Sequence, residues 1–153
     1  MTPSSAVDRR VGDLVTDGTP QGFAEAMYAG DVASRSLGIA VQQVTAGRAT
    51  ARMAVTEAMI NGHGVCHGGY VFFLADTAFA LACNTYGETT VAAGADIVFL
   101  APVRLGDQLV AEAVERVRRG RTGLYDVTVR RADGGIVAEF RGRSRSLGAG
   151  IAG

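Results

Sequence analysis

The segment Tyr70–Cys83 constrains the fold of this chain more than any other feature, because nearly all of its side chains are apolar. Glycines precede it at positions 68 and 69, and Gly87 follows it, as is typical of helix boundaries. These features predict one helix over Gly68–Asn84, about 25 Å long. A helix that is apolar on nearly every side has to be covered by other parts of the protein.

Strand patterns occur on both sides of this helix. Before it, Gly38–Ala46 and Arg48–Thr56 are predicted to form two strands that meet at a turn. After it, four further strands are predicted over Thr89–Ala101, Gln108–Val117, Thr122–Arg131 and Ile136–Ser146.

The last two strands show the clearest alternation, and Asp133-Gly134-Gly135 between them predicts a hairpin turn. In the final strand, we expect Ile136, Ala138 and Phe140 to face the interior. Val137 is then expected to face solvent, because successive strand residues point to opposite sides of a sheet.

The order of the elements defines the fold class. A short helix over Gln21–Ala29 is expected after the N-cap Thr19, and Ser34–Leu37 adds another turn. Two strands, the long helix and four strands follow, which predicts an α+β fold with one antiparallel β-sheet wrapped around one long central α-helix. We expect a flexible N-terminal tail over 1–18 and a single domain over 19–148, with a partner subunit covering the rest of the helix.

Composition limits the kind of protein that this chain can be. Its 153 residues are 48% hydrophobic, which is enough for one buried core and argues against disorder. A formal net charge of zero and the lack of a binding motif argue against nucleic acid as a partner. Met1–Arg10 is polar, no apolar run is long enough to cross a membrane, and both cysteines fit reduced thiols, so a cytoplasmic location is expected.

Asp76 has the clearest chemical potential of any residue in the chain. A carboxylate in apolar surroundings is rare unless it is paired or used, and no arginine lies within the predicted helix. Such a group can attack a carbonyl directly or deprotonate a water molecule, and both roles are open. The alternative is a structural carboxylate, either paired with an arginine from elsewhere or capping a partner helix.

The start of the predicted helix offers a complementary group. The N–H groups of Gly68 and Gly69 lie at the positive end of the helix dipole, and glycine lets a carbonyl approach the backbone closely. Fixed N–H donors stabilise the negative charge that develops on a carbonyl oxygen under attack. The helix start and Asp76 together predict chemistry on a carbonyl group.

The spacing of these two groups predicts the assembly. Gly68 and Asp76 are eight residues apart, about 12 Å along one helix, so one carbonyl cannot contact both within one chain. Asp76 must then come from a second, antiparallel helix. This predicts a two-fold homodimer with two equivalent sites, each built from both chains.

Neighbouring residues suggest two rival sites. His63, Cys66 and His67 could ligate zinc, but no fourth ligand has a recognisable spacing, so no metal and no other cofactor is expected. Cys66 could act as a nucleophile beside His67, although adjacent residues do not have to face each other. His67 could also do no more than cap the helix, and His63 is expected to be structural.

Two groups of arginines could bind phosphate. One group brackets the turn at Gly120 and the other lines the last strand, namely Arg116, Arg118, Arg119 and Arg121, then Arg141, Arg143 and Arg145. The alternative for each of them is a solvated outer face.

Three segments, Asn61–Gly69, Leu74–Asn84 and Phe99–Asp107, resemble the hotdog-fold acyl-CoA thioesterases. The similarity is greatest to the phenylacetyl-CoA or hydroxyphenylacetyl-CoA thioesterase branch of phenylacetic acid degradation, and it covers roughly Leu37–Leu147. It implies a sheet wrapped around the central helix, dimers that often pair into tetramers, and active sites at the dimer interface. It also implies hydrolysis of an acyl-CoA to free acid and CoA. A medium-chain acyl-CoA thioesterase and a non-catalytic acyl-CoA-binding regulator are the alternatives.

The resemblance also implies roles for individual residues. Asp76 matches the catalytic carboxylate, and Gly68 matches the residue whose N–H polarises the thioester carbonyl. His67 and Asn61 match polar residues beside the carbonyl and the attacking water. For substrate binding we expect Gly69 at the helix start and Thr77 with a supporting hydroxyl. From the helical spacing alone, an apolar acyl pocket beside Asp76 is expected from the residues three or four positions away, namely Phe72, Phe73, Phe79 and Ala80, with a purely structural core role as the alternative.

Overall fold

The structure, a computed structural model, describes residues 17–149, so the predicted tail over 1–18 lies almost wholly outside the described residues. The helices are α1 (Pro20–Ala29), α2 (Val32–Ser36), the short 3-10 helix η2 (Glu57–Met59) and α3 (Gly68–Cys83). The strands are β1 (Ala40–Thr45), β2 (Arg48–Ala54), β3 (Glu88–Phe99), β4 (Gln108–Arg119), β5 (Thr122–Arg131) and β6 (Ile136–Ala149).

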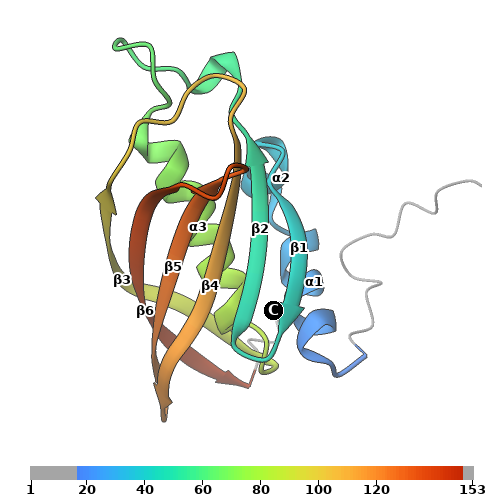
Figure 1. Ribbon diagram of the computed structural model, residues 1–153. Helices are drawn as coiled ribbons and strands as arrows, with labels where there is room; N and C mark the ends of the chain where they lie inside the picture. The colour runs from blue at the N-terminus through green and yellow to red at the C-terminus, as the bar shows by residue number, and fades with distance from the viewer. Residues whose placement is uncertain (1–16, 150–153) are drawn as a thin grey trace, which may run out of the picture.

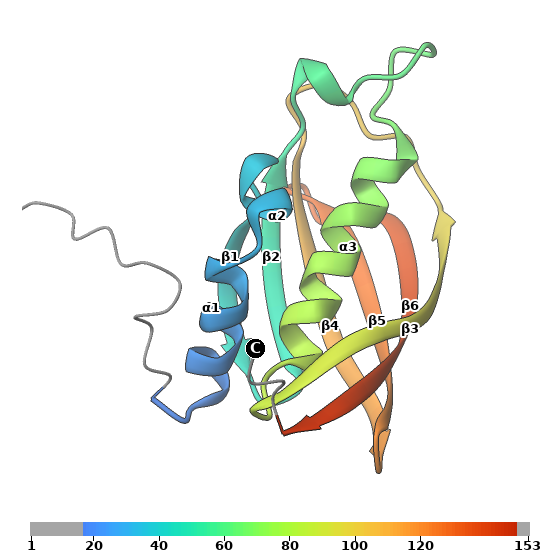
Figure 2. The same cartoon turned by 180° about the vertical axis from the view of Figure 1, so that it is seen from behind.

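The six strands form one antiparallel sheet in the order β1-β2-β4-β5-β6-β3. The sheet curls around α3, which lies against its concave face (Figures 1 and 2). Helices α1 and α2 lie at one side of the molecule, next to β1 (Figure 2). This arrangement confirms the predicted α+β fold with a sheet wrapped around one central helix.

The boundaries of α3 agree with the prediction to within one residue. The helix begins after its N-cap His67, and its C-cap is Asn84. The Asn84 side chain donates hydrogen bonds to the carbonyls of Ala80 (2.8 Å) and Thr90 (3.0 Å), and it accepts one from Thr90 N–H (3.0 Å). The end of α3 is therefore fixed to the start of the edge strand β3.

The core lies between α3 and the sheet. Phe79 is 1% exposed, and its ring packs against Tyr125 and Phe140 with centroid distances of 5.5 and 5.8 Å. Gly142 makes this packing possible, because a Cβ at that position would lie 2.9 Å from the Phe79 ring. Removing a buried phenylalanine ring typically costs about 3–5 kcal/mol, so this contact is a main element of the core.

The prediction for the start of β6 is wrong. Val137, expected to face solvent, is 1% exposed, whereas Ile136, expected inside, is 38% exposed. The β5–β6 register shifts between Val129 and Arg130, so β6 carries an extra residue there and its alternation is interrupted. Beyond this point Ala138 and Phe140 face the interior as predicted.

The N-terminal helices are built on side-chain caps. Thr19 accepts a hydrogen bond of 3.0 Å from Gly22 N–H, which confirms the predicted cap of α1. The turn expected over Ser34–Leu37 is the helix α2, and its N-cap is Asp31. Within this short helix Ser34 is the residue that turns inward, with 1% of its surface exposed.

One side of α3 is left open by the sheet. Gly69, Phe73, Asp76 and Ala80 follow one another at helical spacing, and all four keep accessible surface, whereas Leu74 on the opposite side is fully buried. We call these four residues the open stripe. The edge strand β3 and the segment after it also expose apolar side chains, with Val98 56%, Phe99 52% and Leu100 57% exposed.

Candidate active site

The N-terminus of α3 presents one backbone donor that has no acceptor among the described residues. The His67 Nδ1 accepts a hydrogen bond of 3.2 Å from Gly69 N–H, and the His67 carbonyl accepts one of 3.0 Å from Tyr70 N–H. Within residues 17–149, the Gly68 N–H has no acceptor. Gly68 rather than Gly69 therefore offers a donor to a ligand at the positive end of the helix dipole. His67 has the capping role that the sequence allowed, and a neutral ring then carries its proton on Nε2.

Asn61 organises the loop that leads into α3. Its Oδ1 accepts hydrogen bonds from the backbone N–H groups of His63 (2.9 Å) and Val65 (3.3 Å). A bridge between Ile60 and Cys66 closes this loop, which projects at the top of Figure 1. Because Oδ1 is occupied, the Asn61 amide presents its NH₂ group, for which the described part of the chain supplies no acceptor.

Phe99 is a site residue that the sequence analysis did not assign. A Cβ placed on Gly68 would lie 2.8 Å from the Phe99 ring, so the ring covers the backbone of the helix start. A larger residue at position 68 would therefore have to displace the half-exposed Phe99 ring, and glycine also leaves access to the N–H open. The sequence signal that could have identified Phe99 is its position as the first residue of Phe99–Asp107, one of the segments that resemble the thioesterases.

Asp76 lies on the open stripe, half-buried, at the middle of α3. Among the described residues its carboxylate has no salt bridge, so the structural pair with an arginine is not present there. Burial raises the pKa of Asp76 above its ordinary value, and the nearby charge of Asp31 raises it further. A carboxylate that is costly to ionise and has no salt bridge among the described residues is a stronger base than an exposed one, and acids with a raised pKa in such surroundings are candidates for functional sites.

Asp76→Asn should make the protein more stable at neutral pH. The folded-state pKa of Asp76 is raised, so the stability linked to its protonated form is present below the ordinary value of 3.8 and is lost as pH rises through the folded-state pKa. The amide never ionises and avoids this loss, so we expect the Tm to rise by about 2 °C or more at pH 7. Thermal unfolding of both proteins from pH 3.5 to 7 should show the difference vanish at the acid end. A lower Tm for the variant at pH 7 would contradict this expectation.

The residues expected to bind substrate fall into two sets. Gly69 and Phe73 share the open stripe with Asp76. Phe72 instead packs edge-on against the core ring of Phe140, with 5.2 Å between the ring centroids. Phe79, also expected in the acyl pocket, is 1% exposed and belongs to the core. Thr77 is 4% exposed and its hydroxyl lies 2.8 Å from that of Ser34, so it faces the interior rather than the open stripe.

The rival sites gain no support from the geometry. Cys66 and Cys83 are free and buried, and burial raises the pKa of the Cys66 thiol and raises that of Cys83 to about 12, which disfavours a reactive thiolate. No group of three or more His, Cys, Asp or Glu side chains within residues 17–149 is placed to hold a metal ion. In the same part of the chain, every helix is too short or too polar to cross a membrane.

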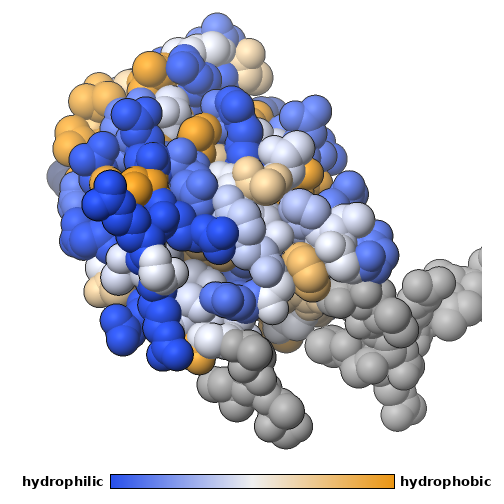
Figure 3. Space-filling view, turned by 90° about the horizontal axis from the view of Figure 1, so that it is seen from below, coloured by the Kyte–Doolittle hydropathy of each residue, from blue (hydrophilic) through white to orange (hydrophobic). Residues whose placement is uncertain are grey.

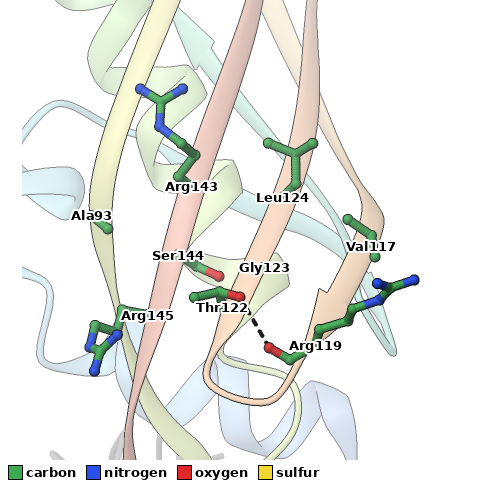
Figure 4. Close-up of a pocket in the computed structure, with 9 residues that line it drawn as sticks. All are labelled: Ala93, Val117, Arg119, Thr122, Gly123, Leu124, Arg143, Ser144 and Arg145. Carbon is green, nitrogen blue, oxygen red and sulfur yellow. Dashed lines mark hydrogen bonds between the residues drawn. The ribbon is translucent and has the colours of Figure 1, made fainter.

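Arg119, Arg143 and Arg145 lie on the outer face of the sheet, whereas the Arg118 guanidinium lies 3.5 Å from the ring centroid of Tyr86, just beyond the end of α3. A groove of about 600 Å³ crosses the four strands β4, β5, β6 and β3 on the outer face. Arg119, Arg143 and Arg145 surround the apolar side chains of Val117 and Leu124 in it (Figure 4). The lower end of the molecule, where the β4–β5 turn lies, shows mostly hydrophilic side chains on the left of Figure 3. None of the predicted catalytic residues lines this groove.

Several of these arginines already have acidic partners. Asp126 pairs with both Arg141 (2.7 Å) and Arg116 (3.4 Å), and Asp96 pairs with Arg143 (3.2 Å). A phosphate would have to compete with these carboxylates. Which arginines contact the phosphates of a CoA therefore stays a prediction.

Known proteins resemble this chain in sequence and in fold. The model of the Thioesterase superfamily matches residues 63–138. The acyl-coenzyme A thioesterase PaaI of Escherichia coli is 45% identical over 130 residues, which are 85% of this chain and 93% of PaaI. The structure of the E. coli PaaI protein from the phenylacetic acid degradation operon has a TM-score of 0.84 at 42% identity, covering 88% of this chain and 97% of that one.

Two more distant structures agree. A variant of the phenylacetic acid degradation protein PaaI from Thermus thermophilus has a TM-score of 0.72 at 36% identity, covering 74% of this chain and 97% of that one. The smu.793 protein of Streptococcus mutans, solved bound to acetyl CoA, has a TM-score of 0.69 at 25% identity, covering 72% and 89% of the two chains.

The curled sheet, its central helix and these likenesses define a hotdog-fold thioesterase, an enzyme that hydrolyses thioesters. The chain belongs to the acyl-CoA thioesterases of this fold, in the branch that includes PaaI.

Proposed function

We propose that this enzyme hydrolyses aromatic acyl-CoA, namely phenylacetyl-CoA or hydroxyphenylacetyl-CoA, to the free acid and CoA. The observation that carries the proposal is the Gly68 N–H, which has no acceptor within residues 17–149 and lies at the tip of the helix whose open stripe holds Asp76. The likeness to PaaI from a phenylacetic acid degradation operon supports the aromatic acyl group.

The Gly68 N–H donates to the thioester carbonyl oxygen and stabilises the charge that this oxygen gains in the tetrahedral state. Asp76 either attacks the carbonyl carbon to give a mixed anhydride or takes a proton from the attacking water. In the first route the C–S bond breaks, CoA leaves as the thiolate, and water then hydrolyses the anhydride to the free acid, restoring Asp76 and supplying the proton for the thiol. In the second route the water oxygen bonds to the carbonyl carbon, the C–S bond breaks, and the proton held by Asp76 passes to the sulfur. His67 and Asn61 supply further donors through Nε2 and the side-chain NH₂ group.

Each site is shared between two chains of a homodimer. Gly68 and Asp76 belong to one unbroken helix, where eight residues span about 12 Å, so a carbonyl held at Gly68 lies beyond the reach of Asp76 in the same chain. The open stripe and the exposed apolar side chains of Val98 and Phe99 on the edge strand β3 supply the surface for a second copy. A dimer of dimers and a cytoplasmic location stay predictions.

The acyl preference is tested by measuring thiol release from a panel of thioesters. Phenylacetyl- and hydroxyphenylacetyl-CoA should be hydrolysed with a kcat/KM at least about tenfold above that for hexanoyl-CoA, because an aromatic ring buries more surface beside Phe73 than a flexible chain does. Benzoyl-CoA, which lacks the methylene group of phenylacetyl-CoA, serves as the matched control for the depth of the acyl pocket. A higher kcat/KM for the straight-chain substrate would instead identify a medium-chain thioesterase.

A further inference from the structure

A chain of polar side chains connects the surface of the protein to the helix turn that holds Asp76. The Asp31 Oδ2 lies 2.6 Å from the Ser34 Oγ, and the Ser34 Oγ lies 2.8 Å from the Thr77 Oγ1. Ser34 and Thr77 are 1% and 4% exposed. Burying a hydroxyl is costly unless it is hydrogen-bonded, so an apolar residue would be the ordinary choice at the inward position of α2.

The donor in each of these hydrogen bonds follows from the number of hydroxyl protons. A carboxylate only accepts, so the single Ser34 hydroxyl proton is donated to Asp31. Ser34 must then accept in its contact with the next residue, and the Thr77 hydroxyl donates to it. The Thr77 hydroxyl therefore donates its hydrogen bond to Ser34 of α2, on the side of α3 away from the open stripe.

Asp31, at the outer end of this series of hydrogen bonds, is held by further contacts. The Asp31 Oδ1 accepts a second hydrogen bond, of 2.9 Å, from Ser34 N–H, and the Asp31 carbonyl accepts one of 3.2 Å from Arg35 N–H. The Arg35 side chain donates to the Ala29 carbonyl at 3.0 Å, which fixes the corner between α1 and α2. The hydrogen bond to Thr77 thus joins α3 to a segment that is itself hydrogen-bonded at Asp31 and Arg35.

We propose that Asp31 and Ser34 are positioning residues for Asp76. The proposal rests on the proposed function, in which Asp76 carries the chemistry. Thr77 is the next residue along α3, so its hydrogen bond to Ser34 fixes the rotation of the turn from which the Asp76 carboxylate projects. A displacement of about 1 Å at a reacting group can cost a hundredfold in rate, so the position of this turn matters.

The charge of Asp31 adds a second effect on the same group. Within the described residues, two groups interact electrostatically with Asp76: Asp31, the N-cap of α2, and the Cys83 thiol of α3. The thiol is neutral because its pKa is raised to about 12. Burial raises the pKa of Asp76 first, and the like charge of Asp31 raises it further. The Asp31–Ser34 pair therefore holds the Asp76 carboxylate in place, and the charge of Asp31 makes it more basic.

Ser34→Ala tests the positioning. It removes the hydroxyl that joins α2 to α3 and leaves the Asp31 cap on Ser34 N–H in place. We expect kcat for phenylacetyl-CoA to fall about fivefold to thirtyfold, with KM changed less than twofold, because binding groups at the Gly68 end are untouched. Ser36→Ala, the same change at an exposed serine of α2, should leave kcat and KM unchanged.

Two further variants separate the hydrogen bond from the charge. Thr77→Val should reproduce the loss of Ser34→Ala, and the double variant should lose no more than either single one, because both remove the same bond. Asp31→Asn keeps a hydrogen-bonding group beside Ser34 but removes the charge, so the pKa of Asp76 falls. The acid limb of its pH–rate profile should therefore move to lower pH by about 0.3 to 1 unit, and the limb in Ser34→Ala should not move.

An unchanged kcat in Ser34→Ala, or losses that multiply in the double variant, would overturn the positioning role. An acid limb that stays in place in Asp31→Asn would remove the effect of the charge. Asp76→Asn in the same assay separates this proposal from the proposed function. If Asp76→Asn is inactive and Ser34→Ala is fully active, only the positioning role fails; if Asp76→Asn is active, the proposed function fails.

Discussion

Asp76→Asn lowers kcat for phenylacetyl-CoA by at least about a thousandfold and leaves KM within about threefold, as measured by thiol release under steady-state conditions. The amide has the size of the carboxylate but can neither attack a carbonyl nor take a proton from water, so either role of Asp76 is lost. Because ground-state binding does not depend on this charge, the loss falls on kcat. The effect is the largest that we expect from one uncharged, isosteric substitution in this chain.

Asp133→Asn is the matched control, because it makes the same substitution in the exposed turn between β5 and β6. Its activity should stay within twofold of the parent enzyme. The Tm of Asp76→Asn, expected to rise at neutral pH, shows at the same time that the loss of activity is not a loss of folding. More than a tenth of the parent kcat in Asp76→Asn would exclude the carboxylate as nucleophile or base.

The fold was predictable where one local pattern dominates. The apolar segment bounded by glycines located α3 to within one residue, and the alternation of Thr122–Arg131 located β5 with its observed bounds. These elements are long, and their burial repeats with a fixed period, so local sequence and tertiary packing agree. At Val137 the local sequence and the tertiary packing do not agree. The extra residue in β6 arises from its pairing with β5, and the pattern of apolar and polar residues in the sequence does not reveal it.

The residues of the candidate site could be selected from the sequence, but not all of their contacts could, and their chemical roles stay predictions. An isolated carboxylate in an apolar helix and glycines at a helix start are visible in sequence, because each departs from what packing alone requires. The contact of Ser34 with Thr77 joins residues 43 positions apart, and the Phe99 ring covers Gly68 from the far end of β3. Neither contact follows from a local period, since both depend on how the sheet curls around the helix.

Gly68→Pro lowers kcat by about a hundredfold or more relative to Gly68→Ala. Proline removes the N–H that polarises the carbonyl, whereas alanine keeps it, and losing one such donor typically costs about 10²–10³ in kcat. Proline suits this place, because it is the first helical position and because His67 before it already has φ −61° and ψ 131°. Both variants put a Cβ against the half-exposed Phe99 ring, so their ratio isolates the N–H. Equal activities of the two variants would exclude the Gly68 N–H from catalysis.

The same two inactive variants test whether the site is shared. In a mixed dimer of Asp76→Asn and Gly68→Pro chains, one site receives Gly68 from the first chain and Asp76 from the second and is intact, while the other site has lost both groups. Random pairing of equal amounts makes half of the dimers mixed, so co-expression should restore about a quarter of the parent activity. Purification through different tags on the two chains, which selects mixed dimers, should raise this to about a half. If each site were built within one chain, no mixed dimer would contain an intact site, and the activity would stay at the level of the single variants.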